Sequence, residues 1–100
     1  MPFEMPSVDE MPSWFVYFLR SCCARFLYVG STNRLHERLL EHNAGMVQST
    51  KVYRPLRMVA YIAVCSERQA RRLEAYFKTG SGKAVLKKRI LTDEVLSSGT

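Results

Sequence analysis

The chain has 100 residues, of which 47% are hydrophobic and 11% aromatic, and its formal net charge at pH 7 is +6. This length suffices for one hydrophobic core but not for two, so we expect one domain that folds without disulfide or metal staples. All fifteen Lys and Arg residues lie from Arg20 onward, where six acidic residues oppose them, which gives that part a net charge of +9. Such a charge on a small domain favours a polyanionic partner, with nucleic acid first, over a charge that only keeps the protein soluble.

The composition argues against membrane and secreted classes of protein. No apolar run reaches the length of a membrane-spanning helix, and the N-terminus lacks the basic region and apolar run of a signal peptide. We therefore expect a cytoplasmic protein without a membrane partner. The cysteines Cys22, Cys23 and Cys65 are odd in number and form no C-x-x-C pair, which favours a reducing compartment and offers no zinc spacing. We expect these thiols to be structurally incidental.

Two strands are predicted at the start of the folded part. Trp14–Leu19 is a continuous apolar and aromatic run, which is typical of a central strand covered on both faces. Phe26–Val29 also has strand character, and the small residues between the two runs predict a hairpin. The hairpin places Tyr17 and Tyr28 on neighbouring strands.

A helix is predicted after the second strand. Gly30 breaks the strand, residues 31–33 offer side-chain oxygens that can cap a helix, and Gly45 ends it. The spacing of its side chains gives the helix two stripes. The stripe expected to face a core consists of Leu35, Leu39 and Leu40. The second stripe, cationic and titratable, consists of Arg34, Arg38 and His42.

The second stripe has two interpretations. Taken alone, charged residues spaced by four usually form a solvated helix face. Because this stripe begins beside a glycine turn and a tyrosine, an anionic group could instead meet Tyr28, Arg38 and His42 together.

A loop, a strand and a second helix are predicted next. Residues 46–55 are too polar for a core strand and are expected at the surface, whereas Leu56–Cys65 predicts the third strand. Ser66 and Gln69 form the S-x-x-Q capping box of the second helix. The inward stripe of that helix consists of Ala70, Leu73 and Phe77.

Glu74 lies at the margin of this apolar stripe, where a carboxylate is unusual. A structural ion pair with Lys78, four residues further on, is one explanation. A half-buried carboxylate facing a basic groove also suits a hard divalent cation such as Mg²⁺. The residues alone leave both interpretations open.

Residues 79–82 are expected to turn the chain, and Lys83–Leu91 predicts a short third helix. The G-S-G-K sequence lacks the spacing of a phosphate-binding loop, so we expect no ATP site. The basic side of the helix either contacts a nucleic-acid backbone or is solvated. Residues expected to face inward are Ala84, Val85, Leu86, Ile90 and Leu91. Residues expected to face outward are Lys83, Lys87, Lys88 and Arg89.

The predicted order of elements is β-β-α-β-α-α. It describes an α/β (α+β) fold in which a three-stranded antiparallel sheet is flanked by helices. We expect this domain over residues 13–92, because residues 1–12 contain three prolines without sustained periodicity and residues 93–100 are acidic and then Ser-rich. The two end segments are expected to be a disordered tail and a flexible C-terminal tail.

The order and spacing of these residues resemble the GIY-YIG nuclease superfamily over roughly residues 14–91. The segment Phe15-Val16-Tyr17 is similar to its first signature and Tyr28-Val29-Gly30 to its second. The residues that follow at the family's spacing are Arg38, His42 and Glu74. The chain looks most like small stand-alone members similar to the N-terminal nuclease domain of the bacterial excinuclease.

The chain departs from the family pattern at two places. Phe15 stands where the first signature usually has a glycine, a replacement that small members tolerate. The family often supplies an asparagine after the glutamate-bearing helix, and here Ser81 or Lys83 stands in that neighbourhood. We expect these departures to bear on substrate positioning and on the level of activity.

The resemblance implies a DNA endonuclease, of repair or mobile-element type, that hydrolyses phosphodiester bonds with Mg²⁺ or Mn²⁺. Glu74 would bind the metal, and the guanidinium fork of Arg38 would donate to a phosphate oxygen. Tyr17 would be the general base with its pKa lowered by His42, while Tyr28 orients water or phosphate, and the two tyrosines can exchange roles. Residues expected to contact the nucleic acid are Arg34, Lys51, Arg54, Lys83 and Lys87.

Two other functions compete with the nuclease. One is a non-catalytic nucleic-acid-binding module with the same fold, and the other is a protein–protein adaptor that uses the aromatic strands. The substrate is open among branched, damaged and single-stranded DNA and RNA, and a partner protein could direct the domain to its target. A single small domain has little surface for reading bases, so we do not expect sequence specificity.

Overall fold

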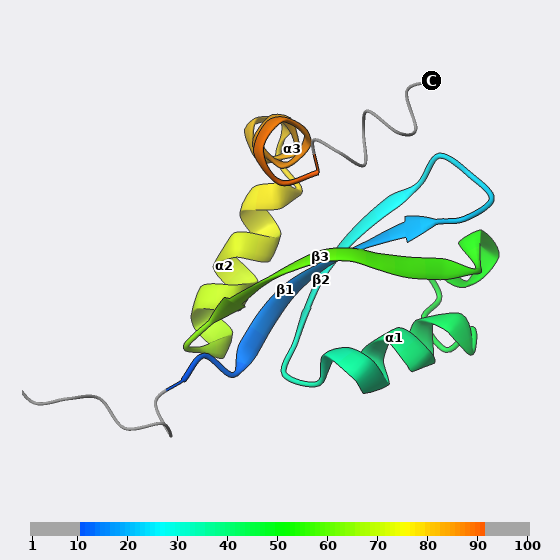
Figure 1. Cartoon of the computed structure of the whole chain (residues 1–100), viewed down its shortest axis with the longest axis horizontal. Helices are drawn as coiled ribbons and strands as arrows, with labels where there is room; N and C mark the ends of the chain where they lie inside the picture. The colour runs from blue at the N-terminus through cyan, green and yellow to red at the C-terminus, as the bar shows by residue number, and fades with distance from the viewer. Residues whose placement is uncertain (1–10, 92–100) are drawn as a thin grey trace, which may run out of the picture.

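The computed structural model describes residues 11–91, and beyond Met11 and Pro12 the two predicted tails lie outside these residues. Figure 1 shows the arrangement of the elements within this range. In chain order they are β1 (Trp14–Ser21), β2 (Leu27–Thr32), α1 (Leu35–Asn43), a 3₁₀ turn (Lys51–Tyr53), β3 (Leu56–Val64), α2 (Glu67–Phe77) and α3 (Gly80–Val85), which continues as a π-helical turn (Leu86–Ile90). The order confirms the predicted β-β-α-β-α-α fold. None of the helices formed by residues 11–91 has the length and apolar character needed to cross a bilayer.

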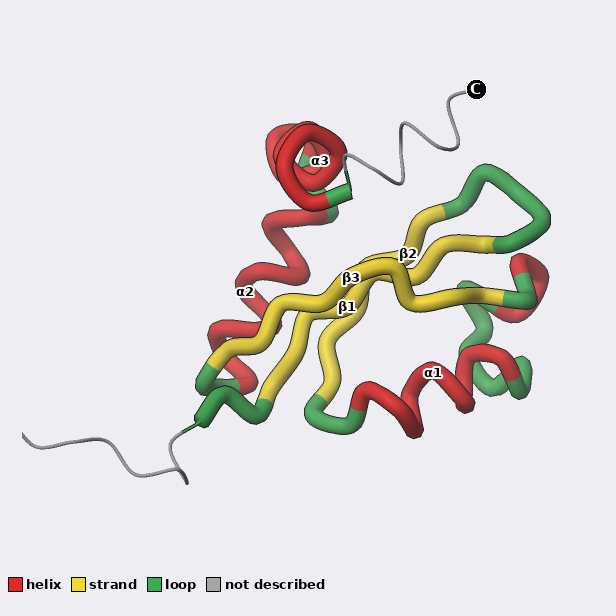
Figure 2. Tube along the Cα trace, viewed as in Figure 1, coloured by secondary structure: helices red, strands yellow, loops and turns green. Residues whose placement is uncertain are grey.

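The strands form an antiparallel sheet with the order β2-β1-β3, so β1 is central as predicted. The hairpin places β2 on one side of β1, and β3 returns to pair on the other side (Figure 2). Within the described residues, β2 is therefore an edge strand. The register places Tyr17 of β1 opposite Gly30 of β2 and Tyr61 of β3.

Side chains of β1 alternate between two hydrophobic cores, one on each face of the sheet. Val16 and Phe18 point toward α2 and α3, where the Phe18 and Phe77 rings meet edge to face with centroids 5.3 Å apart. Tyr17 and Leu19 point to the other face, which α1 covers. Figure 1 shows α1 and α2 on opposite sides of the sheet. The two helices that carry the predicted site residues are therefore separated by the sheet.

Helix α2 begins where the sequence predicted. The Ser66 hydroxyl oxygen accepts a hydrogen bond from the Gln69 backbone N–H at 3.1 Å, which satisfies one free donor of the first turn. The Gln69 side chain in turn accepts a hydrogen bond from the backbone N–H of Cys65 at 3.4 Å. A capping box would use the N–H of Ser66, one residue later. The apolar stripe is also confirmed, because Ala70 and Phe77 are buried and Leu73 packs against them.

Helix α3 begins at Gly80, three residues before the predicted start. The Thr79 hydroxyl oxygen caps it by accepting from the Gly82 N–H at 3.1 Å. The earlier start changes the inward positions, so that Gly82 and Leu86 are buried while Ala84 and Val85 are exposed. The prediction that Ala84 and Val85 face the core is therefore wrong.

Two predictions for α1 are also wrong. Leu40 is 57% exposed, because Leu35 and Leu39 already fill the contact with the sheet. The polar segment 31–33 does not cap the helix, whose N-cap is Arg34 without a side-chain cap hydrogen bond. The Thr32 hydroxyl instead accepts from the Arg34 backbone N–H at 3.0 Å and closes the turn before the helix.

Candidate active site

Tyr17 occupies the middle of the central strand on the face covered by α1, and its side chain is only 1% exposed. Its ring lies across Gly30 on the neighbouring strand. A Cβ atom at Gly30 would lie 2.5 Å from the Tyr17 Oη and 2.6 Å from its Cζ. Gly30 is not among the positive-φ glycines, so this position needs a glycine for space and not for an unusual backbone conformation.

His42 is fully buried beneath the sheet in the last turn of α1. Its Nε2 lies 2.8 Å from the Tyr17 hydroxyl, and its Nδ1 lies 2.8 Å from the Thr50 hydroxyl. Burial, assisted by the charge of Arg38, lowers the pKa of His42 to about 4. The imidazole is therefore neutral at pH 7. The prediction of a cationic, titratable stripe on α1 is therefore wrong at this residue, and so is the alternative of a solvated face.

The two tyrosines differ in their access to solvent. Burial raises the pKa of Tyr17 to about 12, although a hydrogen bond from Arg38 acts in the opposite direction. A buried phenol with a raised pKa does not fit the expected role of Tyr17 as the base that contacts water. Tyr28 is half-buried and lies beside this group, with its ring centroid 6.1 Å from that of Tyr17 and 5.0 Å from that of His42. Of the two phenols, Tyr28 is the one that reaches solvent.

Arg38 projects from α1 toward the same group. Its Nε donates to the Tyr17 hydroxyl oxygen at 3.3 Å, and its Nη1 pairs with the Glu41 carboxylate at 2.9 Å. The hydrogen bond to Glu41 raises the pKa of Arg38 further above its ordinary value, so the guanidinium is permanently charged. These contacts fix the plane of the fork and leave N–H groups for an anion.

Glu74 lies on the α2 side of the sheet, and its side chain is 23% exposed. Its carboxylate accepts a hydrogen bond from the Ser31 hydroxyl at 2.5 Å and pairs with Lys78 at 2.8 Å. Burial acts to raise the pKa of Glu74, but the hydrogen bonds from Lys78 and Ser31 outweigh it and hold the pKa below its usual value. Glu74 is therefore ionised at neutral pH. The ion pair predicted from the i, i+4 spacing is confirmed.

The structure thus divides the predicted site residues between two hydrogen-bonded groups on either side of the edge strand β2. Tyr17, Arg38 and His42 form the first group on the α1 side, while Glu74 belongs to the second. The groups approach each other at β2, because Ser31, which binds Glu74, directly follows Gly30 in the chain. Lys78 of the second group also lies near Tyr28, which packs beside the first group: the Lys78 Nζ is 6.0 Å from the centroid of the Tyr28 ring.

The donor set of the second group is compatible with a hard divalent cation. Across residues 11–91, three or more His, Cys, Asp or Glu side chains nowhere gather into a metal cage. Mg²⁺ commonly takes one or two carboxylates and completes its shell with water and substrate phosphate, so a single ionised Glu74 suffices as its protein ligand.

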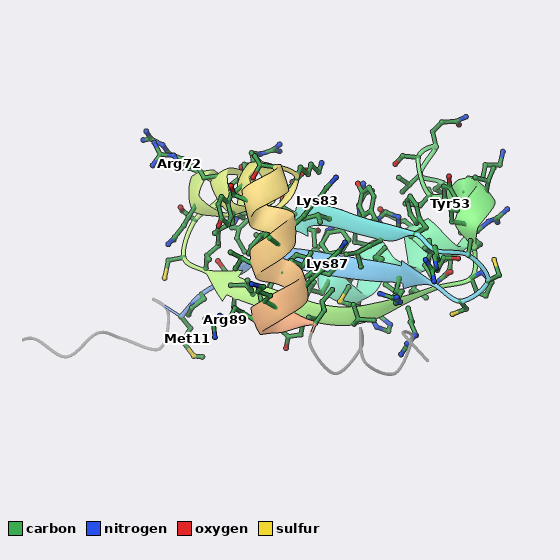
Figure 3. The ribbon with its side chains drawn as sticks, turned by 90° about the horizontal axis from the view of Figure 1, so that it is seen from above. Met11, Tyr53, Arg72, Lys83, Lys87 and Arg89 are labelled. Atoms are coloured by element: carbon green, nitrogen blue, oxygen red, sulfur yellow. The ribbon has the colours of Figure 1, made fainter. Side chains whose placement is uncertain are left out.

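A cleft of about 430 Å³ follows the outer edge of β2 and reaches α3, and of the five expected catalytic residues Tyr28 alone lines it. Tyr28 lines it together with Lys78, Lys83 and Lys87. Figure 3 shows Lys83 and Lys87 on one side of α3, pointing along the sheet toward Tyr53, while Arg72 and Arg89 point elsewhere. The structure therefore brings two of the predicted nucleic-acid contacts to the cleft that contains Tyr28.

The other predicted nucleic-acid contacts lie apart from this cleft. Lys51 and Arg54 line a separate, open depression beside Asn43. Arg54 has an intramolecular role there, because its Nε donates to the Lys51 carbonyl at 2.8 Å and its guanidinium packs over Gly45. Arg34 is exposed at the start of α1.

Sequence reasoning missed Thr50, which is fully buried although it belongs to a polar segment that was expected at the surface. The prediction for residues 46–55 is wrong at this residue. Its hydroxyl contacts His42, a partner eight residues away whose position no local pattern indicates. Asn43 was also missed as a structural residue. Its side-chain amide exchanges two hydrogen bonds of 2.8 Å with the backbone of Leu56, which fixes α1 to β3.

The fold, the paired tyrosines and the arginine-bearing helix agree with the nuclease family that the motifs resemble. The chain belongs to the GIY-YIG family, since the sequence profile of the GIY-YIG catalytic domain matches residues 13–89. This confirms the resemblance noted from the motifs. The family implies a nuclease-type function and a nucleic-acid substrate.

Two relatives are similar over most of their length. The UPF0213 protein YazA of Bacillus subtilis (strain 168) is 32% identical over 83 residues, which cover 82% of this chain and 81% of that protein. A UPF0213 protein of Bacillus pumilus (strain SAFR-032) is 32% identical over 68 residues, covering 67% and 69%. No solved structure matches the chain.

Proposed function

We propose that this protein is a metal-dependent endonuclease that hydrolyses phosphodiester bonds of DNA at the outer edge of β2. The cleft at that edge is the observation that carries the proposal. It places a tyrosine that reaches solvent, Tyr28, beside Lys78, Lys83 and Lys87, whose positive charges suit a phosphate backbone. Neither Arg38 nor Glu74 lines this cleft, and the proposal requires that a nucleic acid bound at the edge of β2 reach both of them from it.

Each side chain has a role that follows from its surroundings. The fork of Arg38, held by Tyr17 and Glu41, would donate to a non-bridging oxygen of the scissile phosphate, where charge increases in the transition state. Glu74, which is ionised, would hold a Mg²⁺ or Mn²⁺ ion, and such an ion polarises phosphate and stabilises a leaving oxygen.

We assign the contact with water to Tyr28 and a supporting role to Tyr17, which exchanges the roles first expected of them. A phenol acts as a base only where nearby cations stabilise the phenolate. The Nζ of Lys78, the C-cap residue of α2, lies 6.0 Å from the Tyr28 ring centroid and is such a cation. The Tyr17 hydroxyl is hydrogen-bonded to Arg38 and His42, and the Tyr17 ring packs beside the Tyr28 ring and so helps to position it.

The proposal is tested by a cleavage screen with the purified chain. Plasmid, branched and single-stranded DNA, and RNA, are each incubated with Mg²⁺, with Mn²⁺ and with EDTA. We expect metal-dependent cleavage of at least one DNA substrate, its loss in Glu74→Gln, and its retention in the control Glu67→Gln. Glu67 is an exposed carboxylate of the same helix that pairs with Arg71.

The remaining outcomes separate the competing functions. If no substrate is cut and Glu74→Gln changes nothing, the nuclease proposal fails. DNA affinity that falls steeply with salt would then support the non-catalytic binding module. The adaptor alternative predicts no salt-dependent DNA affinity at all.

A further inference from the structure

Four side chains form a continuous hydrogen-bonded chain through the interior on the α1 side of the sheet. It runs from the Arg38 guanidinium to the Tyr17 hydroxyl (3.3 Å), to His42 Nε2 (2.8 Å), and from His42 Nδ1 to the Thr50 hydroxyl (2.8 Å). The Thr50 hydroxyl then lies 3.4 Å from the Val47 carbonyl oxygen. Tyr17, His42 and Thr50 are buried, and no buried side-chain polar atom of the described residues is left without a partner.

The two ends of this chain favour one direction of its hydrogen bonds. At one end, the Val47 carbonyl can only accept, so a Thr50 hydroxyl that donates to it at 3.4 Å presents a lone pair to His42 Nδ1. At the other end, Arg38 can only donate, so the Tyr17 oxygen accepts from it and keeps one hydrogen that it can donate to His42 Nε2. Both ends are therefore satisfied by the same tautomer of His42, with the proton on Nδ1.

Thr50 reaches this position because the loop after α1 is folded back and tied to itself. Gly45 turns the chain with φ of +79°, and the Arg54 guanidinium packs over it where a Cβ atom would lie. Thr50 then starts the 3₁₀ turn Lys51–Tyr53, whose Tyr53 N–H bonds back to the Thr50 carbonyl at 2.9 Å. The loop thus fixes both the backbone and the hydroxyl of Thr50 relative to His42.

We propose that Thr50 is a positioning residue for the reaction proposed above. Its hydroxyl oxygen holds the His42 proton on Nδ1, so that Nε2 stays free to accept the Tyr17 hydroxyl hydrogen. The Tyr17 oxygen then keeps its lone pairs for Arg38 and for the neighbouring Tyr28. Without Thr50, the His42 proton is free to move to Nε2, which turns the Tyr17 hydroxyl hydrogen away from His42 and disturbs both of these contacts.

The tautomer is measured directly by a two-bond ¹H–¹⁵N correlation spectrum of the ¹⁵N-labelled chain, in which protonated and unprotonated ring nitrogens are well separated. The chain has two histidines. His36 is exposed, which makes it an internal reference. We expect His42 to carry its proton on Nδ1 in the wild-type chain and in Thr50→Ser. In Thr50→Val, which keeps the volume but removes the hydroxyl, we expect a shift toward the Nε2–H form, with His36 unchanged.

A wild-type His42 protonated on Nε2 would overturn the proposal, and so would an unchanged tautomer in a folded Thr50→Val protein. If Thr50→Val does not fold, Thr50→Cys replaces it, because a thiol is a weak acceptor. In the cleavage assay we expect Thr50→Val to lower kcat at unchanged DNA affinity and Thr50→Ser to restore it, whereas equal kcat in all three proteins would refute the positioning role. Absence of cleavage in the wild-type chain would refute the proposed function, while the spectrum would still decide the tautomer.

Discussion

Replacing Gly30 by Ala tests the packing on which the candidate site depends. The added Cβ would lie 2.5 Å from the Tyr17 Oη and 2.6 Å from its Cζ, well inside van der Waals contact. The Tyr17 ring has no free space into which to move, because it is 1% exposed and its hydroxyl is bonded to His42 and Arg38. The substitution therefore forces the hydroxyl away from at least one of these partners.

The expected cost follows from two terms and one small gain. Overpacking of a core costs about 1–3 kcal/mol. Loss of the Tyr17 donor leaves the buried Nε2 of His42 unsatisfied, which costs about 1–3 kcal/mol more. Alanine recovers about 0.5–1 kcal/mol of strand stability relative to glycine. We expect a net loss of about 3 kcal/mol in the free energy of unfolding.

Urea unfolding followed by circular dichroism measures this loss. At about 1.5 kcal/mol per M of urea, typical of a small domain, the midpoint should fall by about 2 M. Gly80→Ala is the matched control, because a Cβ at Gly80 meets nothing within 4 Å, and its stability should stay within about 0.5 kcal/mol of wild type. A Gly30→Ala protein as stable as this control would refute the argument that Gly30 provides space for Tyr17.

Three further predictions concern the site itself. Folding lowers the pKa of His42 from 6.5 to about 4. The stability that the neutral imidazole contributes is therefore fully present above pH 6.5 and is lost as the pH falls toward 4. The free energy of unfolding should drop by about 2 kcal/mol from pH 7 to pH 5 in urea titrations, in His36→Gln as well as wild type, and a flat profile would contradict this. Arg38→Lys, which keeps the charge but loses the fork, should lower kcat at least about 100-fold without unfolding the chain, and near-normal kcat would mean that a point charge suffices. Tyr28→Phe should lower kcat at constant DNA affinity, and unchanged turnover would remove Tyr28 as the base.

The order of elements was predictable because each signal is local. A strand-length aromatic run and the Ser66 cap each act within a few residues, and the structure places them as expected. The prediction that Gly30 breaks the second strand is wrong, because Gly30 lies inside β2 and pairs with Tyr17. The pairing of Glu74 with Lys78 was predictable for the same reason, since i, i+4 neighbours on a helix meet whatever the tertiary fold.

The burial of individual side chains was not predictable, because it depends on how elements pack. His42 looked like part of a solvated stripe, yet the loop carrying Thr50 folds over it, and its two ring nitrogens are hydrogen-bonded to Thr50 and to Tyr17 of β1. Tyr17 looked like the reactive phenol, yet the sheet and α1 enclose it. Leu40 was expected to be buried and is exposed, because it lies outside the contact between α1 and the sheet.

The placement of Arg38 and Glu74 on helices that cover opposite faces of the sheet has a mechanical consequence. Helices α1 and α2 each pack against their own hydrophobic core, and the sheet, with β2 at its edge, separates the two halves of the site. A substrate that contacts both halves therefore connects the two faces of the sheet. It couples two helical layers that otherwise contact each other only through the sheet, so occupancy of the site should slow hydrogen exchange in both helices at once.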